Sequence, residues 1–202
     1  ALIFGVAVVN IGISGVTNET ALPKEIQTPG AGIHVRECDT LQIEHVDIRR
    51  KAFGILFDKT VQPMPWNVAD VLTLRNAYFS FCGWAIYVDG WLGNAKISNI
   101  FGYINSLGLL YKSGTIGQYD WEVDSLTSQD DGWNGTVAPL YLATAQDLSV
   151  SRVTINGATP TRSTPIIHVI LNQFTWANQT AYSGHVWLHQ LTLFGTKVCD
   201  SM

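Results

Sequence analysis

Hydrophobic residues recur along this chain in a fixed arrangement of two closely spaced pairs. In the stretch LQIEHVDI the apolar side chains are Leu41, Ile43, Val46 and Ile48. Residues at i and i+2 lie on one face of a β-strand. The two-residue step between the pairs breaks this alternation. We therefore expect two short strands that meet at a bend, with all four side chains pointing inward.

The same arrangement occurs seven times, at intervals of 23 to 38 residues. Of the 28 aligned positions 26 are apolar, all but Gly102 and Ser128, whereas 47% of 28, about 13, would be expected by chance. A repeat of this length is typical of a solenoid, in which each coil covers the apolar face of the next. The copies begin at Val6, Leu41, Leu72, Ala95, Trp121, Leu148 and Val186.

A third short run of β-type residues lies between successive copies. In three places it starts seven residues after the last inward residue, as from Ile48 to Ile55 and from Gly102 to Leu109. Three strands per coil predict an all-β parallel β-helix of about seven coils over residues 1–195, with a tail at 196–202. The runs are Ile33–Val35, Ile55–Phe57, Ile86–Val88, Leu109–Tyr111, Leu140–Leu142 and Ile167–Val169.

Polar positions of the repeat have structural explanations. Charges on neighbouring copies face each other, and we expect the ion pairs Glu44–Arg75 and Lys96–Glu122. The residue at each bend is often asparagine, which tolerates a left-handed backbone, so this position predicts a left-handed corner. The corner residues are Asn10, His45, Asn76, Asn99, Ser125, Arg152 and Gln190.

Composition narrows the function further. The 202 residues carry a net charge of −4 and no basic run, which argues against nucleic-acid binding. The apolar N-terminal run of about 15 residues is too short to span a bilayer, so no membrane insertion is expected. Because the chain starts inside a strand, we expect it to be part of a longer polypeptide. The odd set Cys38, Cys82 and Cys199 favours buried or turn thiols over disulfides or zinc.

Three long connections are predicted to leave the solenoid at one corner, namely Asp58–Asp70, Lys112–Asp120 and Ile170–His185. Loops on a rigid scaffold often carry function. Aromatic rings stack on sugars and also bury at subunit interfaces, and both interpretations remain open here. The candidate carbohydrate-binding residues are Trp66, Tyr119 and Trp176 in these loops and Trp187 on a strand.

The densest acidic group is Asp120, Glu122 and Asp124, which alternate with inward Trp121 and Val123. Carboxylates at i and i+2 of a strand lie about 6.5–7 Å apart, near the separation found in inverting glycosidases. The three are therefore candidate catalytic residues, although acidic ridges on solvated strands are common and a structural role is the simpler interpretation. The five histidines lack metal-ligand spacing, and we expect neither a metal nor another cofactor.

The copies LQIEHVDIRRKAFGILF and AKISNIFGYINSLGLLY resemble coils of the right-handed parallel β-helix superfamily, which includes pectate lyases, polygalacturonases and bacteriophage tailspikes. The resemblance spans roughly residues 4–195 and concerns the coil pattern. The motifs of polygalacturonases and the calcium-binding carboxylates of pectate lyases are missing from the chain.

The resemblance implies three functions. The first is a tailspike-type virion domain, homotrimeric in that family, that binds host surface polysaccharide and in some members depolymerises it. The second is a free, secreted polysaccharide lyase or glycoside hydrolase. The third is a structural β-helix without a ligand. The missing enzyme motifs and the start inside a strand favour the first.

Overall fold

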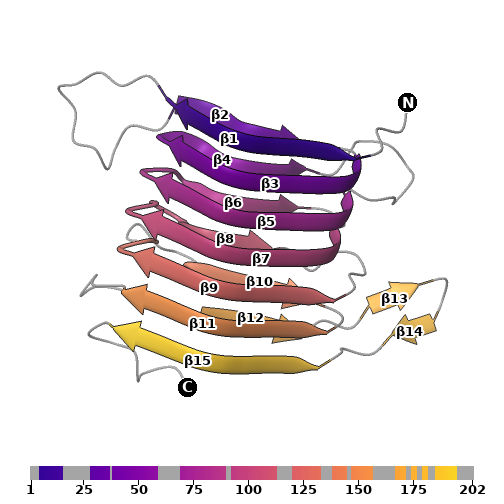
Figure 1. Cartoon of the computed structure of the whole chain (residues 1–202). Helices are drawn as coiled ribbons and strands as arrows, with labels where there is room; N and C mark the ends of the chain where they lie inside the picture. The colour runs from indigo at the N-terminus through magenta and orange to yellow at the C-terminus, as the bar shows by residue number, and fades with distance from the viewer. Residues whose placement is uncertain are drawn as a thin grey trace.

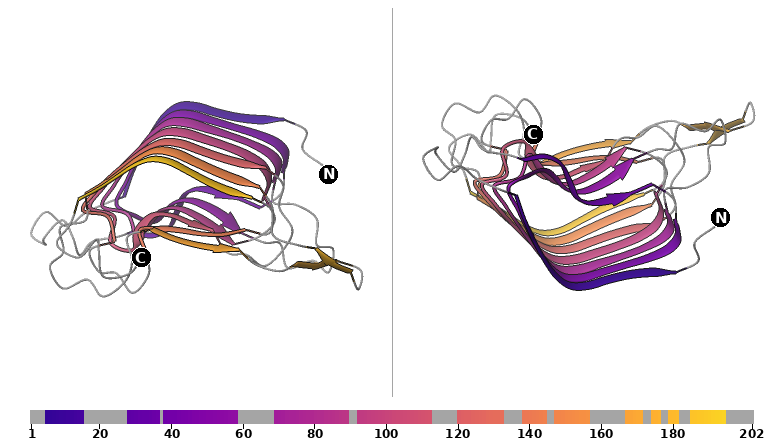
Figure 2. Two further views of the ribbon diagram at one scale, coloured as in Figure 1. Left: turned by 90° about the horizontal axis from the view of Figure 1, so that it is seen from below. Right: turned by 90° about the horizontal axis from the view of Figure 1, so that it is seen from above.

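The computed structural model describes residues 5–15, 28–36, 38–58, 69–89, 92–112, 120–132, 138–144, 147–156, 167–171, 174–176, 179–181 and 185–194. They form two parallel sheets that face each other across the apolar interior (Figures 1 and 2). The strands of the seven-stranded sheet, in spatial order, are β1 (Val6–Ser14), β3 (Cys38–Arg49), β5 (Ala69–Ser80), β7 (Leu92–Tyr103), β9 (Trp121–Gln129), β11 (Leu148–Asn156) and β15 (Val186–Phe194).

The six-stranded sheet lies opposite. Its strands are β2 (Thr28–Val35), β4 (Lys51–Asp58), β6 (Trp84–Asp89), β8 (Gly108–Lys112), β10 (Leu140–Thr144) and β12 (Ile167–Leu171). A small antiparallel hairpin of β13 (Phe174–Trp176) and β14 (Gln179–Ala181) stands apart from both sheets (Figure 1). Alternate strands along the chain enter opposite sheets, so the fold is an all-β parallel solenoid.

The predicted alignment of the repeats is confirmed residue by residue. Leu41 pairs with Val6 on one side and Leu72 on the other, and the register continues through Ala95 and Trp121. In β3 to β11 every inward position of the repeat is buried. The outermost copies on β1 and β15 are only partly buried, because each has a described neighbour on one side alone.

The prediction of two separate strands on either side of the bend is wrong. Each copy is one continuous strand, bent near its middle (Figure 2), because the residues on both sides of the corner keep the same parallel partners. The corner itself is as predicted. All seven corner residues have positive φ angles, between 50° for Arg152 and 56° for Asn10. Each turn therefore holds two strands, one per sheet, in place of three.

About three turns are seen, in place of the seven coils predicted. The seven copies do pair in one sheet, but a full turn also needs its strand in the other sheet and the link between them. Long strand, corner and short strand are described without a break only in residues 38–58, 69–89 and 92–112.

The short runs form the six-stranded sheet, with one change of register. Leu110, not Leu109, aligns with Ile86 and Leu140. Because side chains alternate between the faces of a strand, this one-residue shift reverses the orientation of the residues that follow. Lys112 consequently aligns with the buried positions Val88 and Leu142 and points into the interior.

The two polar exceptions in the repeat, Gly102 and Ser128, are partners in neighbouring strands. A side chain at Gly102 would collide with the carboxyl group of Asp131, so the glycine leaves room for this buried side chain. Asp131 accepts hydrogen bonds from Ser128 Oγ and from both the backbone N and the Nδ2 of Asn105, each at 2.8 Å. The two exceptions therefore make room for, and bind, an interior polar cluster.

Cys38 and Cys82 are buried thiols, as predicted, whereas Cys199 lies outside the described residues. Burial raises the pKa of the Cys82 thiol to about 11. Among the residues that the structure describes, no helix has the length and apolarity needed to cross a membrane.

Candidate functional site

The outer face of the seven-stranded sheet carries two rows of side chains where β7, β9, β11 and β15 begin. The aligned residues Ala95, Trp121, Leu148 and Val186 point inward. The residues just before them form the first row, and the residues just after them form the second. Adjacent strands are about 4.8 Å apart, so side chains within a row are close enough to act on one ligand. The first row is Asn94, Asp120, Asp147 and His185, and the second is Lys96, Glu122, Ser149 and Trp187.

A surface cavity of about 410 Å³ lies over these rows, and we call it the groove. It brings together Asp120 and Glu122, two of the three predicted catalytic residues, with Trp187, a predicted binding aromatic. The Trp187 side chain is 44% exposed, which is unusual for a tryptophan. The lining residues are Asn94, Ala95, Lys96, Asp120, Trp121, Glu122, Asp147, Ser149 and Trp187.

Trp121 gives the groove a fixed support. Its side chain is buried, as the repeat predicts, and its indole Nε1 donates hydrogen bonds to the carbonyl oxygens of Gly93 (2.9 Å) and Leu92 (3.3 Å). These bonds tie the start of β9 to the start of β7. The flanking residues Asp120 and Glu122 are consequently presented from rigid backbone.

The predicted pair between Lys96 and Glu122 is confirmed, with 3.7 Å between Nζ and Oε2. Both side chains are largely exposed, and exposed pairs contribute little to stability because water screens them. The two charges therefore remain accessible to a ligand in the groove.

Asp147 and His185 belong to the site, although the sequence did not single them out. The backbone N of His185 donates to Asp147 Oδ1 at 2.7 Å, and its ring Nδ1 lies 3.3 Å from the same oxygen. The backbone hydrogen bond lowers the pKa of Asp147, so this carboxylate is ionised at neutral pH. The His185 ring centroid is 5.4 Å from that of Trp187. The available clue was position, since both residues align with Asp120 in the repeat.

Asp124, the third predicted catalytic residue, is not part of the groove lining. Arg152 Nε donates to its Oδ1 at 2.7 Å, a second Arg152 nitrogen binds Oδ2, and Ser151 Oγ donates at 2.7 Å. The Arg152 hydrogen bond, supported by Ser151, holds the pKa of Asp124 well below its usual range. A carboxylate held ionised in this way is unsuited to donate a proton, so the candidate pair for catalysis reduces to Asp120 and Glu122.

The side chains of the other three predicted binding aromatics are not among those that the structure describes. Trp66 and Tyr119 lie outside the described residues, and for Trp176 only the backbone, in β13, is described. The ends of the three predicted loops are described. Each predicted loop begins at the end of a strand in the six-stranded sheet and ends at the start of one in the seven-stranded sheet (Figure 1). The residues that line the groove lie where strands of the seven-stranded sheet start.

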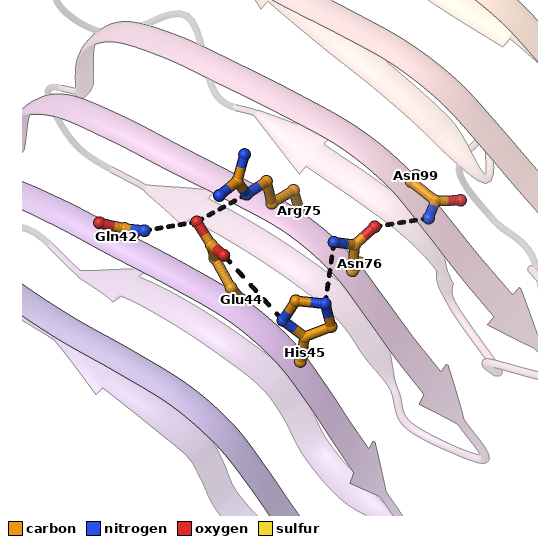
Figure 3. Close-up of polar contacts among 6 residues, drawn as sticks. All are labelled: Gln42, Glu44, His45, Arg75, Asn76 and Asn99. Atoms are coloured by element: carbon orange, nitrogen blue, oxygen red, sulfur yellow. Dashed lines mark hydrogen bonds and ion pairs between the residues drawn. The ribbon is translucent and has the colours of Figure 1, made fainter.

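A second polar group, around Glu44, lies on the outer face of the same sheet but is occupied by its own partners (Figure 3). Glu44 Oε1 is 2.6 Å from Arg75 Nε and also accepts a hydrogen bond from Gln42, and the first of these contacts chiefly lowers its pKa. The corner side chains continue the network, with Asn76 bonded to His45 and to Asn99. These bonds link three successive turns, which indicates a structural role.

Lys112 lies in the interior. Its side chain is 1% exposed, Nζ donates to the carbonyl oxygen of Ala143 at 3.0 Å, and Nζ sits 5.1 Å from the centroid of the Trp121 ring. Burial lowers its pKa to about 7. The cation therefore packs against a tryptophan that also lines the groove.

The outer face of the six-stranded sheet carries a run of aromatic rings that sequence reasoning did not identify. Tyr111 stacks on Tyr87 with centroids 4.7 Å apart and on Tyr141 at 4.9 Å, and Trp84 packs against both Tyr87 and Tyr111. Stacked pairs across parallel strands stabilise the sheet. We assign this cluster to holding successive turns together.

Comparison with protein-family models, with curated proteins and with solved structures gives no match for this chain. Within the described ranges, no group of three or more histidine, cysteine, aspartate or glutamate side chains is arranged to hold a metal ion. The functional interpretation therefore depends on the groove and on the fold that presents it.

Proposed function

We propose that this solenoid is a polysaccharide-binding domain and that the groove is its binding site. The observation that carries the proposal is the meeting of exposed Trp187 with Asp120 and Glu122 in one cavity. Aromatic rings pack on the apolar faces of sugars, and carboxylates accept hydrogen bonds from hydroxyl groups. The lining comes from four consecutive strands, so a glycan lying along the solenoid axis would contact the protein over about 14 Å.

In its fuller form the proposal is a tailspike-type domain: a right-handed parallel β-helix that acts as a homotrimer on a virion and binds host surface polysaccharide. The parallel solenoid and the resemblance of its repeats to that superfamily support this reading, as does the usual right-handedness of parallel crossovers. The alternatives are a free polysaccharide-degrading enzyme and a structural β-helix. A monomeric mass in solution would contradict the tailspike form.

Cleavage of the bound glycan is a second candidate function, favoured by the presence of Asp120 and Glu122 in the same lining. Asp120 directly precedes β9 and Glu122 follows two residues later, so their backbones are about 6.5–7 Å apart in an extended chain. This spacing suits a general acid and a general base acting on opposite sides of a glycosidic bond. If this pair is catalytic, Glu122→Gln abolishes the release of new reducing ends while the glycan still binds.

The binding proposal is tested with an array of bacterial surface and plant polysaccharides, followed by calorimetry on a retained glycan. We expect Trp187→Ala to weaken binding at least tenfold, because loss of a central aromatic contact costs more than about 1.4 kcal/mol. Tyr78→Ala is the matched control, since Tyr78 stacks on Phe101 on the other arm of the same sheet, outside the groove. Equal binding by the Trp187 and Tyr78 variants, or no retained glycan, would refute the proposal.

A further inference from the structure

We infer that the groove selects a glycan with free, protonated amino groups over its N-acetylated form and over an acidic glycan. This inference rests on the proposed function and names the substrate class for the same site. It follows from the balance of charge in the lining, from the spacing of the carboxylates and from the aromatic ring beside them.

The lining has an excess of negative charge. Among the described lining residues, Asp120, Glu122 and Asp147 contribute three carboxylates and Lys96 contributes one ammonium group, which leaves two carboxylates in excess. His185, beside them in the first row, contacts Asp147 through its backbone N and its ring Nδ1. Lys96 is engaged by Glu122 at 3.7 Å. The other two carboxylates are those of Asp120 and Asp147, in the first row.

Asp120 and Asp147 stand side by side. The backbone N of Trp121, the residue after Asp120, donates to the carbonyl oxygen of Asp147 at 3.0 Å, which places the two aspartates at the same level of adjacent strands. Their backbones are therefore about 4.8 Å apart. A cation bound between them would interact favourably with both carboxylates. A glycan ammonium group carries that charge together with hydrogen-bond donors.

Trp187 adds a second feature that favours a cation. It lines the same cavity, and its exposed ring is available to a ligand. The face of an indole ring attracts ammonium groups and also packs on the apolar face of a sugar. An amino sugar satisfies the ring and the carboxylates at once, whereas an N-acetyl group keeps the sugar face but loses the charge.

Among the described lining residues, an acidic glycan would meet one cation, Lys96, which Glu122 already contacts. The nearby arginines on the same outer face are each bound to a carboxylate of their own, Arg75 to Glu44 and Arg152 to Asp124. A uronate in the groove would instead face the excess carboxylates, and a cleft of one charge sign repels ligands of the same sign.

The test compares three hexasaccharides by calorimetry at pH 6 and low salt: the glucosamine hexamer, the N-acetylglucosamine hexamer and the galacturonate hexamer. We expect the glucosamine hexamer to bind at least tenfold more tightly than the N-acetylated one, and the galacturonate hexamer not to bind. The preference should shrink as salt is added, because exposed charges are screened. Equal affinities, or tightest binding of galacturonate, would overturn the inference and leave the proposed function standing.

Variants test whether glucosamine binding depends on the groove carboxylates or only on the net negative charge of the protein. Asp120→Asn and Asp147→Asn should each weaken glucosamine binding about tenfold, the loss of one charge contact, with N-acetylglucosamine binding unchanged. The control is Asp47→Asn, which removes a carboxylate paired with Arg49 on the outer face of β3. If all three variants weaken glucosamine binding equally, attraction is non-specific and the inference fails. If none of the saccharides binds and the glycan array also retains none, the proposed function fails with it.

Discussion

Two carboxylates of one short segment, Asp131 and Glu122, show how the surroundings decide what a charge does. Asp131 is 1% exposed and accepts three hydrogen bonds inside the solenoid, whereas the Glu122 side chain is 58% exposed and lies in the groove. In the interior, burial raises the pKa of Asp131 to about 7. The difference separates two roles: interior charges control stability, and groove charges are available to a ligand.

Among the changes predicted, replacement of Asp131 by alanine should lower the free energy of unfolding the most. Asp131→Ala leaves the backbone N of Asn105 and the hydroxyl of Ser128 without their acceptor, and it leaves Asn105 Nδ2 with the carbonyl oxygen of Phe79. We expect the free energy of unfolding to fall by about 3 kcal/mol, measured by chemical denaturation. Glu122→Gln is the control and should change it by less than about 0.5 kcal/mol. Similar losses in both variants would contradict the separation of roles.

The pH dependence of stability should distinguish buried Asp131 from the exposed carboxylates. Folded Asp131 keeps its proton up to about pH 7, whereas an ordinary aspartate releases it near pH 4, so the unfolded chain binds fewer protons between these values. The free energy of unfolding should therefore fall as the pH rises from about 4 to about 7. Denaturation at a series of pH values checks this, and Asp131→Asn should abolish the slope. A slope that persists in that variant would show that other groups cause it.

The smallest effect is expected at the other interior charge, Lys112. In the folded protein the pKa of Lys112 is about 7, well below the ordinary value of 10.5. Below about pH 7 the buried side chain is charged, and burying that charge lowers the free energy of unfolding. Lys112→Met should raise the free energy of unfolding by about 1 kcal/mol at pH 6, because an apolar side chain avoids the cost of burying charge. The gain should shrink as the pH rises from about 7 towards 10.5, because the folded lysine has then lost its proton and the unfolded lysine approaches its own ordinary pKa. A gain that is the same at pH 6 and at pH 10 would contradict this cause.

Much of the solenoid could be predicted from the order of residues, because its contacts are those of a repeat. Once Leu41 is aligned with Leu72, parallel pairing at a fixed register determines which residues are inward, which are neighbours and which lie at the corner. The ion pairs Glu44–Arg75 and Lys96–Glu122 and the left-handed corners followed from this alignment and are confirmed. Part of the groove followed as well, since Asp120, Glu122 and Trp187 were singled out.

Other features depended on departures from the repeat. The alignment of Leu109 was wrong by one residue, and Lys112, which was predicted to begin a loop, is instead a strand residue that points into the interior. The repeat does not mark Asp131 as a core residue, and only the structure shows that its carboxyl group lies inside, in the space left by Gly102. His185 and Asp147 are 38 residues apart, and their contact requires the intervening chain to complete its path.

The sequence by itself determined the parallel solenoid and its inward face, because hydrophobic burial repeated at a fixed register leaves one consistent stacking. The tertiary structure alone decided which charges are enclosed and which share a groove. Those outcomes depend on local shifts of register and on side chains from several turns, such as Asp120, Asp147 and Trp187, that meet only after the turns have stacked. The electrostatic character of the groove, and with it the glycan we expect it to bind, arises from that stacking.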